Sequence, residues 1–463
     1  MKVAMVVSEM EPFAKTGGLA DVTGSLPLAL GKLGVEVHVF MPRYACVKES
    51  SDRVTPAQGV TVHFIAHEGY FHRPGLYGEA DGDYPDNLDR FSFFCRQTLV
   101  RMKSAGIRPD ILHAHDWQAA LSVVYLEKQF RQDPLFSKTR SVLTVHNLGY
   151  QGVFAKEEYP KLSLPWELFS MDGFEFYGKV NLLKGGLLCA RALTTVSPTY
   201  SKEIQTPEGG AGLDGILRAR SAHLVGILNG LNQQIWNPAT DRLLPFRYDE
   251  KKRKERARNK ASLQEEVGLP VSPRTMLVGM VTRLADQKGV DLVIEALPKL
   301  LKMNLQLVIL GAGDRSIQEQ LHQATTKYPA LRAHLGFDER LARQIYAGAD
   351  AFLMPSRYEP CGLGQMIAMR YGAVPVVRAT GGLNDTVSDV GLHERTGRGF
   401  CFAAPEAAAL AEAVHRAMKV FEQPRQWETL QRRCMKSDFS WDRPAKEYLH
   451  LYSRLMTHPH DRS

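Results

Sequence analysis

The chain has 463 residues, of which 44% are hydrophobic and 23% charged, a balance typical of a folded globular protein. At roughly 150 residues per domain, this length predicts two or three domains. No apolar run approaches the about 20 residues of a membrane-spanning helix, so we expect no membrane insertion. The six cysteines are scattered without a CxxC pair, which argues against a disulfide framework or zinc knuckle and favours a reducing cytoplasm.

The net charge is +8, from 58 Lys and Arg against 50 Asp and Glu. A basic chain can bind nucleic acid, an anionic membrane surface or a phosphorylated small molecule. The densest basic run, RYDEKKRKERARNK from Arg247, includes Asp249, Glu250 and Glu255, and after Tyr248 it has no aromatic residue to stack on bases. It therefore predicts a solvated helix face and no nucleic-acid partner.

Short apolar runs rich in Val, Ile and Leu recur along the first half of the chain. Their continuous hydrophobicity is typical of strands buried on both faces of a parallel sheet. Helix-like segments such as 116–130, which carries an Asp N-cap signal, separate several of them, as βαβ units require. The predicted strands are KVAMVVS from Lys2, EVHVFMP from Glu36, ILHAH from Ile111, SVLTVHN from Ser141, ALTTVS from Ala192 and HLVGILNG from His223.

The same alternation restarts after a proline-containing basic stretch at 237–273, with MLVGMVTRL from Met276, LQLVILGAG from Leu305, AFLMPS from Ala351 and VPVVRA from Val374. The sequence therefore predicts an α/β protein with two Rossmann-like, doubly wound domains, at 1–240 and 241–440. The tail 441–463 is helix-like with one apolar stripe. We expect it to form a C-terminal helix that can pack back on the first domain.

Two similar glycine pairs each follow a predicted strand. TGGLADV starts at Thr16, and TGGLNDTV starts at Thr380. Glycine lets a backbone approach a ligand closely, and the following helix start offers unpaired N–H groups to an anion. The alternative is that Gly-Gly merely permits a tight turn, but the repetition favours two ligand cradles facing one cleft.

Polar residues follow most of the predicted strands, where parallel α/β sheets bind ligands. His146 and Asn229 follow two strands of the first half; a buried histidine is more often a satisfied core residue, but clustering at one sheet edge favours function. Arg283 and Lys288 follow one strand and match a diphosphate, unless they are surface charges. Glu359 stands in a Pro- and Gly-containing turn and can accept hydrogen bonds from sugar hydroxyls.

Several other enzyme classes lack support. No GxxxxGK[ST] motif is present, the run Gly311–Ala312–Gly313 has no third glycine at dinucleotide-binding spacing, and no serine stands in a GxSxG elbow. A P-loop NTPase, a dehydrogenase and a serine hydrolase are therefore not expected. Cys361 has no visible base partner, so we do not expect a catalytic thiol.

Nine motifs together resemble one family. They are KTGGLADV from Lys15, HAHDWQAAL from His113, TVHNLGYQGVF from Thr144, TTVSPTYSKEI from Thr194, GLDGILRAR from Gly212, GILNGLNQQIWNPATD from Gly226, TRLADQKG from Thr282, PSRYEPCGLGQ from Pro355 and TGGLNDTV from Thr380. In this order and spacing they resemble bacterial glycogen synthases and plant starch synthases, glycosyltransferase family 5. The matches run from Lys15 to about Asp389.

The resemblance implies the GT-B architecture, in which two Rossmann-like domains face a deep cleft. It implies retaining transfer of glucose from ADP-glucose to the non-reducing end of an α-1,4-glucan, in glycogen biosynthesis, with the first domain on the acceptor side and the second on the donor side. It also implies catalytic roles for His146, Arg283, Lys288 and Glu359. The donor-binding residues that it implies are Lys15, Gly17, Gly18, Asp21, Asn229, Gly381, Gly382 and Leu383.

Two positions depart from the family pattern: Asn232 stands where Asp is usual, and Gly364 where Thr is usual. We expect these two departures to affect how the donor is bound more than which class of reaction is catalysed. The alternatives are a transferase of the same architecture that uses UDP-glucose or another acceptor, and a catalytically silent glucan-binding protein. The latter is expected to have lost Lys15, Arg283, Lys288 or Glu359, and all four are present.

No cofactor and no metal are expected. A D-x-D pair, Asp81–Gly82–Asp83, could hold Mg²⁺ on a diphosphate. Its surroundings, YGEADGDYPDNLD, predict a surface loop instead. Since no carboxylate nucleophile is apparent either, we expect same-face attack, with the departing phosphate accepting the proton.

Overall fold

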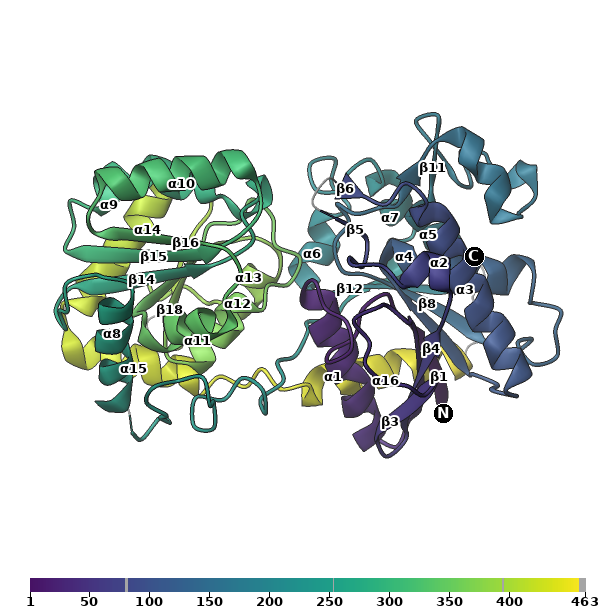
Figure 1. Cartoon of the computed structure of the whole chain (residues 1–463), viewed down its shortest axis with the longest axis horizontal. Helices are drawn as coiled ribbons and strands as arrows, with labels where there is room; N and C mark the ends of the chain where they lie inside the picture. The colour runs from purple at the N-terminus through teal and green to yellow at the C-terminus, as the bar shows by residue number, and fades with distance from the viewer. Residues whose placement is uncertain (80–81, 253, 394, 458–463) are drawn as a thin grey trace. The chain divides into compact units, whose positions relative to one another are not determined.

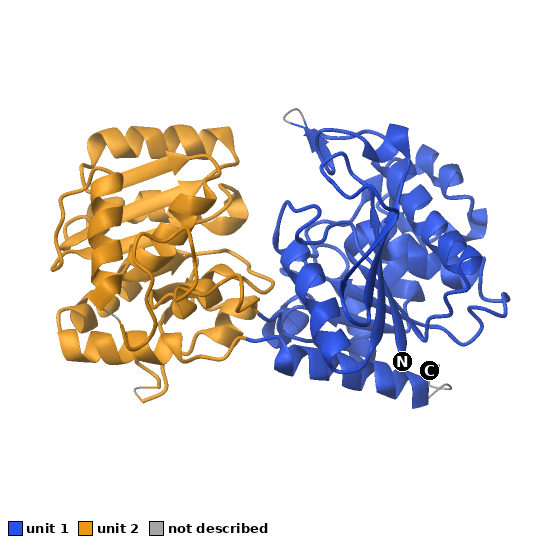
Figure 2. Ribbon diagram, turned by 60° about the horizontal axis from the view of Figure 1, so that its bottom comes forward, with its two compact units in different colours: residues 1–230, 440–463 blue, residues 231–439 orange. Residues whose placement is uncertain are grey.

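The computed structural model describes residues 1–79, 82–252, 254–393 and 395–457. The chain forms two compact units, coloured separately in Figure 2. Unit 1 comprises Met1–Gly230 and Ser440–Ser463, and unit 2 comprises Leu231–Phe439. The division expected near residue 240 therefore lies inside unit 2, and the described part of the C-terminal tail belongs to unit 1.

Unit 1 is built on an eight-stranded sheet in the order β13-β12-β8-β7-β1-β2-β4-β3, parallel throughout except for β3. The apolar strands are buried on both faces, as their continuous hydrophobicity predicts. The bounds are β1 Lys2–Val6, β2 Glu36–Pro42, β3 Arg53–Ala57, β4 Val60–Ile65, β7 Ile111–His115, β8 Arg140–Val145, β12 Ala192–Thr195 and β13 Leu224–Gly226.

Helices cover the sheet of unit 1 in two groups (Figure 1). One group includes α1 (Gly18–Lys32) and the C-terminal helix α16 (Asp442–Thr457), which contact each other. The other includes α3 (Asn87–Ser104), α4 (Asp116–Lys128) and α5 (Leu182–Cys189). The smaller elements are α2 Glu68–Phe71, β5 Gly78–Glu79, β6 Gly82–Asp83, β9 Val153–Phe154, η1 Lys156–Leu162, η2 Trp166–Leu168, β10 Glu175–Phe176, β11 Lys179–Asn181, α6 Pro198–Glu203, α7 Asp214–Ala219 and η3 Ser221–His223.

Unit 2 has a six-stranded, fully parallel sheet in the order β16-β15-β14-β17-β18-β19. Alternate residues of β14 enter different cores: Met276 and Val278 pack in one cluster, and Leu277 packs in another. Both faces of the sheet are therefore covered. The strands are β14 Met276–Val281, β15 Leu305–Gly311, β16 Leu331–Leu335, β17 Ala351–Met354, β18 Val374–Arg378 and β19 Phe400–Phe402.

Helices of unit 2 supply the other side of each core. They are α8 Lys254–Glu266, η4 Asp286–Lys288, α9 Val290–Leu300, α10 Arg315–Lys327, α11 Glu339–Gly348, α12 Gly364–Arg370, α13 Gly381–Thr386, α14 Ala407–Phe421 and α15 Pro424–Met435. The basic run contributes to α8, where Arg256 and Lys260 are buried rather than solvated. Lys260 pairs with Asp350 at 2.7 Å, so part of that run serves the core.

Each sheet has one point at which the strand order reverses. In unit 1 the chain builds β2 on one side of β1 and later β7 on the other; in unit 2 it builds β15 on one side of β14 and later β17 on the other. Ligands of doubly wound sheets bind at such points, outside the carboxyl ends of the strands. The loops after β1 and β7, and those after β14 and β17, are therefore where sites are expected.

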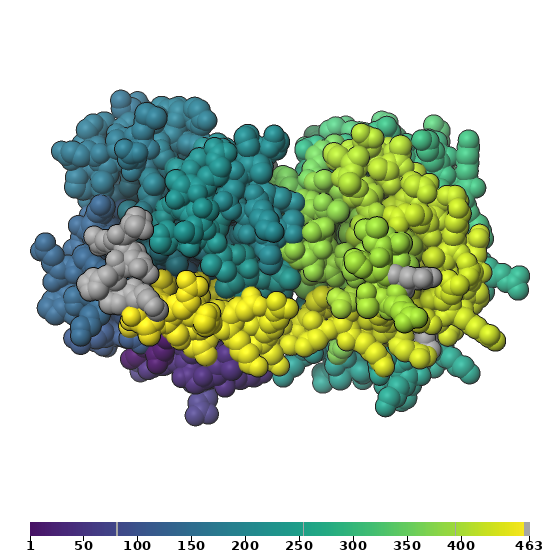
Figure 3. Space-filling model, turned by 180° about the vertical axis from the view of Figure 1, so that it is seen from behind, coloured from purple at the N-terminus to yellow at the C-terminus, as the bar shows by residue number. Residues whose placement is uncertain are grey.

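The C-terminal helix lies on the surface of unit 1, where Figure 3 shows it in yellow beside the purple N-terminal residues. Its apolar stripe is buried, with Tyr448 and Tyr452 fully covered. Among the helices that the structure describes, none is long and apolar enough to cross a bilayer.

All ten predicted strands are present. The sequence interpretation missed β3, β4, β16 and β19 in the two main sheets, together with the short strands β5, β6 and β9–β11. It also assigned the N-cap of α4 to Asp116. The cap is His115, and Asp116 is the first helical residue, at φ 57°.

Candidate active site

The loop after β1 in unit 1 is organised by Glu9. This buried carboxylate accepts hydrogen bonds from the Thr16 N–H at 2.5 Å and the Thr16 hydroxyl at 2.7 Å, and a longer one from the Gly17 N–H at 3.3 Å. The Tyr77 hydroxyl donates to it at 2.7 Å. Glu9 therefore holds the glycine turn in place through these hydrogen bonds.

The turn itself is exposed and leads into α1. Lys15, Gly17 and Gly18 are exposed, and the Lys15 Nζ lies 2.7 Å from an Asp21 carboxylate oxygen. A Cβ added at Gly17 would meet nothing within 4 Å, and its extended backbone suits any residue. The open space above Gly17 is therefore available to a ligand, and the start of α1 offers N–H groups toward an anion.

Three histidines and Asp116 lie at the ends of β7 and β8. The rings of His113 and His115 lie close together at a tilt of 34°, with centroids 4.1 Å apart, and His115 Nδ1 lies 2.9 Å from His146 Nε2. The Asp116 carboxylate accepts the backbone N–H of His146 at 2.6 Å. Asp116 adopts a left-handed conformation, which is rare outside glycine and costs energy that the surrounding structure must offset.

Burial sets the charge of this cluster. Desolvation lowers the pKa of His113 and His146 to about 3, and the pKa of His115 lies well below its usual value for the same reason and because of the neighbouring histidines. Burial, opposed by two backbone hydrogen bonds, raises the pKa of Asp116 to about 7. The three rings are therefore neutral at pH 7 and act as hydrogen-bonding groups rather than as charges.

Asn229 follows β13 near the end of unit 1. It is buried, and within the described ranges its Oδ1 has no hydrogen-bond partner. A buried amide oxygen without a partner is unusual in a native protein, so this position fits a group that completes its hydrogen bonds with a ligand.

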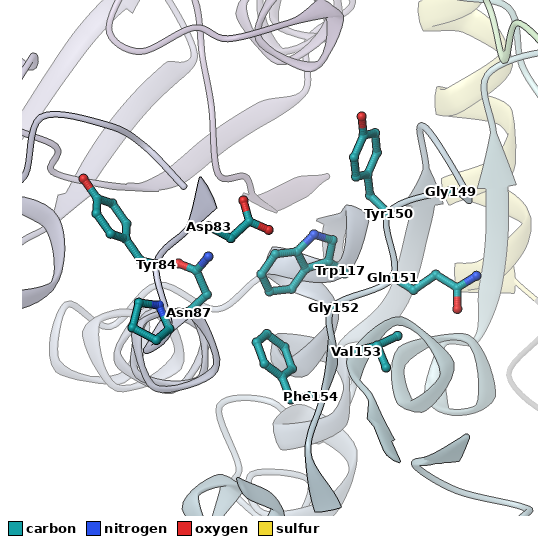
Figure 4. Close-up of a pocket in the computed structure, with 11 residues that line it drawn as sticks. Asp83, Tyr84, Asn87, Trp117, Gly149, Tyr150, Gln151, Gly152, Val153 and Phe154 are labelled. Carbon is teal, nitrogen blue, oxygen red and sulfur yellow. The ribbon is translucent and has the colours of Figure 1, made fainter. Parts of the chain in front are cut away.

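Unit 1 also contains a cavity of about 460 Å³. Figure 4 shows Trp117 near its centre, with Asp83 and Asn87 on one side and the segment 149–154 on the other. The cavity combines aromatic rings with amide and carboxylate groups, the combination that binds sugar rings. It is lined by Asp83, Tyr84, Pro85, Asn87, Trp117, Gly149, Tyr150, Gln151, Gly152, Val153 and Phe154.

In unit 2 the loops after β14 and β17 bring three predicted residues together. Lys288 Nζ lies 2.6 Å from a Glu359 carboxylate oxygen, which also accepts the Ser356 hydroxyl at 2.9 Å. Gln287 bridges the two loops, since its side chain donates to the Tyr358 carbonyl and accepts from Arg283. Arg283 is exposed and Lys288 is half-buried, so both cations remain accessible to a ligand.

The second glycine turn packs tightly against the Glu359 loop. A Cβ at Gly381, where φ is 45°, would lie 2.0 Å from the Glu359 carbonyl oxygen, and one at Gly382 would lie 2.1 Å from that of Cys361. The N–H groups of Gly382 and Leu383 already donate to backbone carbonyls. These glycines therefore hold the Glu359 loop in place, and a ligand-binding role for Gly381, Gly382 and Leu383 stays a prediction.

No group of three or more His, Cys, Asp or Glu residues arranged for a metal ion occurs in the described part of the chain. Asp81 of the D-x-D pair lies outside the described residues. Asp83 ends β6 of a short hairpin and lines the cavity beside Trp117. Asp83 is exposed, as the expected surface position requires, although the segment forms a short hairpin rather than an irregular loop.

The structure groups the predicted residues by unit. The start of α1 and the loop before it contain Lys15, Gly17, Gly18 and Asp21. A cluster in unit 2 contains Arg283, Lys288 and Glu359 and packs against the Gly381 turn. Glu9 was visible after the first predicted strand but received no role. The residues that sequence interpretation missed are Tyr77, which supports the first turn together with Glu9, and most of the cavity lining. The motif TVHNLGYQGVF contains Tyr150, Gln151 and Phe154, so these residues were already singled out from the sequence. That they line a cavity depends on tertiary packing, which the motif does not reveal.

Two family models match the chain. Residues 2–219 match the starch synthase catalytic domain, and residues 264–433 match glycosyl transferases group 1. These matches and the two parallel α/β units define a two-domain glycosyltransferase of the GT-B class.

Full-length relatives narrow the family further. The chain is 45% identical to glycogen synthase 2 of Geobacter sulfurreducens and 43% identical to glycogen synthase of Thermotoga maritima, with 98% of this chain covered in each case and 98% and 99% of the relatives. The catalytic domain of starch synthase IV from Arabidopsis thaliana, bound to ADP and acarbose, matches at 34% identity with a TM-score of 0.89, covering 98% of this chain and 99% of that one. The chain belongs to the glycogen and starch synthase family.

A more distant structure supports the fold alone. Sucrose-phosphate synthase from Thermosynechococcus elongatus matches with a TM-score of 0.64 at 17% identity, over 98% of this chain and 99% of that chain.

Proposed function

We propose that this protein is a glycogen synthase that transfers glucose from ADP-glucose to the non-reducing end of an α-1,4-glucan, with retention of configuration. The observation that carries the proposal is the cluster of Arg283, Lys288 and Glu359 at the reversal point of unit 2. Two cations beside a carboxylate suit a donor that has a diphosphate at one end and a sugar at the other.

The geometry of the cluster suits such a donor. Lys288 and Glu359 form an ion pair with side chains 17% and 7% exposed, so the carboxylate is held in one position before substrate arrives. A diphosphate recruits Lys288 together with Arg283, while Glu359 accepts sugar hydroxyls. A relative of high structural similarity was solved with ADP, which supports adenine as the base of the donor.

The cavity of unit 1 suits the glucan. Indole and phenol rings stack on the apolar faces of glucose, and the exposed Asp83 carboxylate can accept a sugar hydroxyl at its edge. The amides of Asn87 and Gln151 are already hydrogen-bonded within the protein and shape the wall. The Arabidopsis relative was solved with acarbose, which supports a site for a glucan-like chain in this family.

The proposed chemistry follows from charge. Cleavage of the bond between glucose C1 and the diphosphate develops negative charge on the leaving group, which Arg283 and Lys288 stabilise. The acceptor hydroxyl attacks from the same face, and its proton passes to the departing phosphate. Within unit 1, we propose substrate-binding roles for Lys15, the Gly17–Gly18 turn, His146 and Asn229. The six free thiols suit the cytoplasmic location proposed for this reaction.

One assay tests the proposed function against its alternatives. We expect glycogen to be labelled from ADP-glucose bearing radioactive glucose, with ADP released in equal amount. Labelling from UDP-glucose at comparable kcat/KM would favour a transferase with another donor preference. Glycogen binding without ADP release would indicate a silent glucan-binding protein.

The reaction is expected to need no divalent metal. Arg283 and Lys288 already supply positive charge at the diphosphate position proposed in unit 2, and a dication would compete with them. Initial rates should therefore be unchanged by excess EDTA. Loss of activity on chelation, restored by Mg²⁺ or Mn²⁺, would overturn both this expectation and the assigned clamp.

Tyr150 tests the glucan cavity separately from the donor site. Its side chain lines the cavity while remaining 50% exposed, so removing it should not disturb the core. Tyr150→Ala should raise the KM for glycogen about 2- to 10-fold, as expected for losing one ring contact, and leave the KM for ADP-glucose unchanged. Tyr177→Ala is a matched control, because that ring is 81% exposed in the same unit and lies outside the cavity lining.

A further inference from the structure

The histidine cluster of unit 1 contains a residue with no assigned role. His115 is fully buried, and its Nδ1 lies 2.9 Å from Nε2 of His146, which is only half-buried. We infer that His115 is a positioning residue that holds His146 as the neutral tautomer protonated on Nδ1, so that this N–H can donate to a substrate oxygen. The inference rests on the role proposed above for His146.

The direction of the hydrogen bond follows from what the other ring nitrogen of His115 contacts. His115 Nε2 is buried, and no hydrogen-bond partner for it occurs in the described ranges. If His115 accepted the bond from His146, its own proton would sit on Nε2 as a buried N–H without an acceptor, which native proteins rarely contain. If His115 donates from Nδ1, only a lone pair is left unpaired.

Donation from His115 fixes the proton of His146. A neutral imidazole carries one N–H, and the hydrogen bond at one nitrogen decides which atom carries it. When His146 Nε2 accepts, the proton must lie on Nδ1. Burial keeps both rings neutral at pH 7, since it lowers the pKa of His146 to about 3 and that of His115 well below its usual value.

The ring of His115 is itself held by a hydrogen-bonded neighbour. It lies beside the tilted ring of His113, whose Nδ1 lies 2.7 Å from the Tyr452 hydroxyl and whose Nε2 lies 2.6 Å from the Thr144 hydroxyl. These two contacts anchor the His113 ring from α16 and from β8. Helix α16 thus fixes His113, and His113 fixes the plane of His115.

The sheet register explains why these side chains meet. His113 and His115 are two residues apart on β7 and share one face of the sheet, as do Thr144 and His146 along and just beyond β8. His115 pairs with Thr144 across the two parallel strands. The arrangement is therefore a property of two adjacent strands and one covering helix, all within unit 1.

Two substitutions at His115 separate positioning from packing. Asparagine can place an amide N–H where the Nδ1–H of His115 lies, whereas leucine fills the space without a donor. We expect His115→Leu to lower kcat about 10- to 100-fold, the scale for a misplaced catalytic group, and His115→Asn to restore most of that loss. A merely structural role predicts the reverse order, because leucine packs at least as well as asparagine in an apolar site.

A matched control uses another buried histidine pair of the same unit. His63 on β4 is 4% exposed, and its Nε2 lies 3.0 Å from Nδ1 of His38, far along the sheet order from β7 and β8. His63→Leu should leave kcat unchanged. A loss equal to that of His115→Leu would mean that removing any buried histidine has this effect, and would overturn the inference.

A direct readout does not depend on activity. In protein labelled with ¹⁵N-histidine, correlations from the carbon-bound ring protons distinguish the two tautomers, and His146→Gln identifies the His146 signals by their loss. We expect His146 to carry its proton on Nδ1 in the wild type and to become a mixture in His115→Leu. A wild-type His146 protonated on Nε2 overturns the inference even if His115→Leu does not fold. If the tautomers are as expected but neither His115→Leu nor His146→Gln lowers kcat, the proposed role of His146 fails and the positioning relation stands.

Discussion

Arg283→Ala is expected to lower kcat by about 10²–10³, the scale for removing one charge-stabilising donor from a transition state. The Arg283 side chain is exposed and makes a 3.3 Å bond to Gln287, so its loss should leave the melting temperature nearly unchanged. The KM for glycogen should also be unaffected, because the proposed glucan cavity lies in unit 1. Steady-state kinetics with ADP-glucose and glycogen measure both parameters.

Lys288 requires a gentler substitution for the same test. Its ammonium group pairs with the buried Glu359 carboxylate, and truncation to alanine would leave that charge with only the Ser356 hydroxyl, which destabilises the loop as well as the transition state. Lys288→Gln keeps a hydrogen-bond donor and removes the charge. We expect a loss in kcat comparable to that of Arg283→Ala.

Arg315→Ala is the control for both variants. That side chain is 92% exposed in the same unit and pairs with Glu319, one turn along α10. It should retain wild-type kcat. If Arg283→Ala or Lys288→Gln behaves like Arg315→Ala, the residue concerned has no part in stabilising the leaving group.

The parallel sheets were predictable because buried strands leave a local signal. Runs such as KVAMV in β1 and LQLVILG in β15 are apolar at all but one position each, Lys2 and Gln306, as expected for a strand covered on both faces or a buried helix. Two of the missed strands, both at sheet edges, lack that signal: β3 is RVTPA, with a proline and an exposed arginine, and β16 is only partly buried. An edge strand depends on its neighbour for pairing, which local composition does not reveal.

Part of the candidate site was also predictable, because the position of a buried strand fixes where the residues that follow it lie. Residues directly after buried strands must gather at the carboxyl edge of the sheet, so Arg283, Lys288 and Glu359 could be grouped from sequence order. Contacts between elements that are far apart in the chain could not be predicted in this way. Glu9 was visible after β1, but its bonds to Thr16 and Tyr77 require β1, α1 and the segment before α3 to meet.

Asp116 shows a different limit. An aspartate before a helical run predicts an N-cap, and the capping preference is real. In the structure its carboxylate instead accepts the backbone N–H of His146 on the neighbouring strand. A tertiary hydrogen bond therefore outweighs the local one, at the cost of a left-handed backbone at residue 116.

The two glycine turns should respond in opposite ways to the same substitution. At Gly381 the backbone is left-handed and an added Cβ would lie 2.0 Å from the Glu359 carbonyl oxygen. Gly381→Ala is therefore expected to cost about 1–3 kcal/mol of stability, lowering the melting temperature by about 3–10 °C, and to reduce activity by displacing Glu359. Thermal melts and kcat should fall together.

At Gly17 the backbone is extended and the position of the added methyl is empty, with nothing within 4 Å. Gly17→Ala should therefore melt at the wild-type temperature. If the donor occupies that space, the methyl should nevertheless lower kcat/KM for ADP-glucose about 10- to 100-fold, equivalent to about 1–3 kcal/mol of steric conflict. A Gly17→Ala enzyme with wild-type stability and wild-type kcat/KM would show that the first glycine turn does not contact the donor and serves only to begin α1.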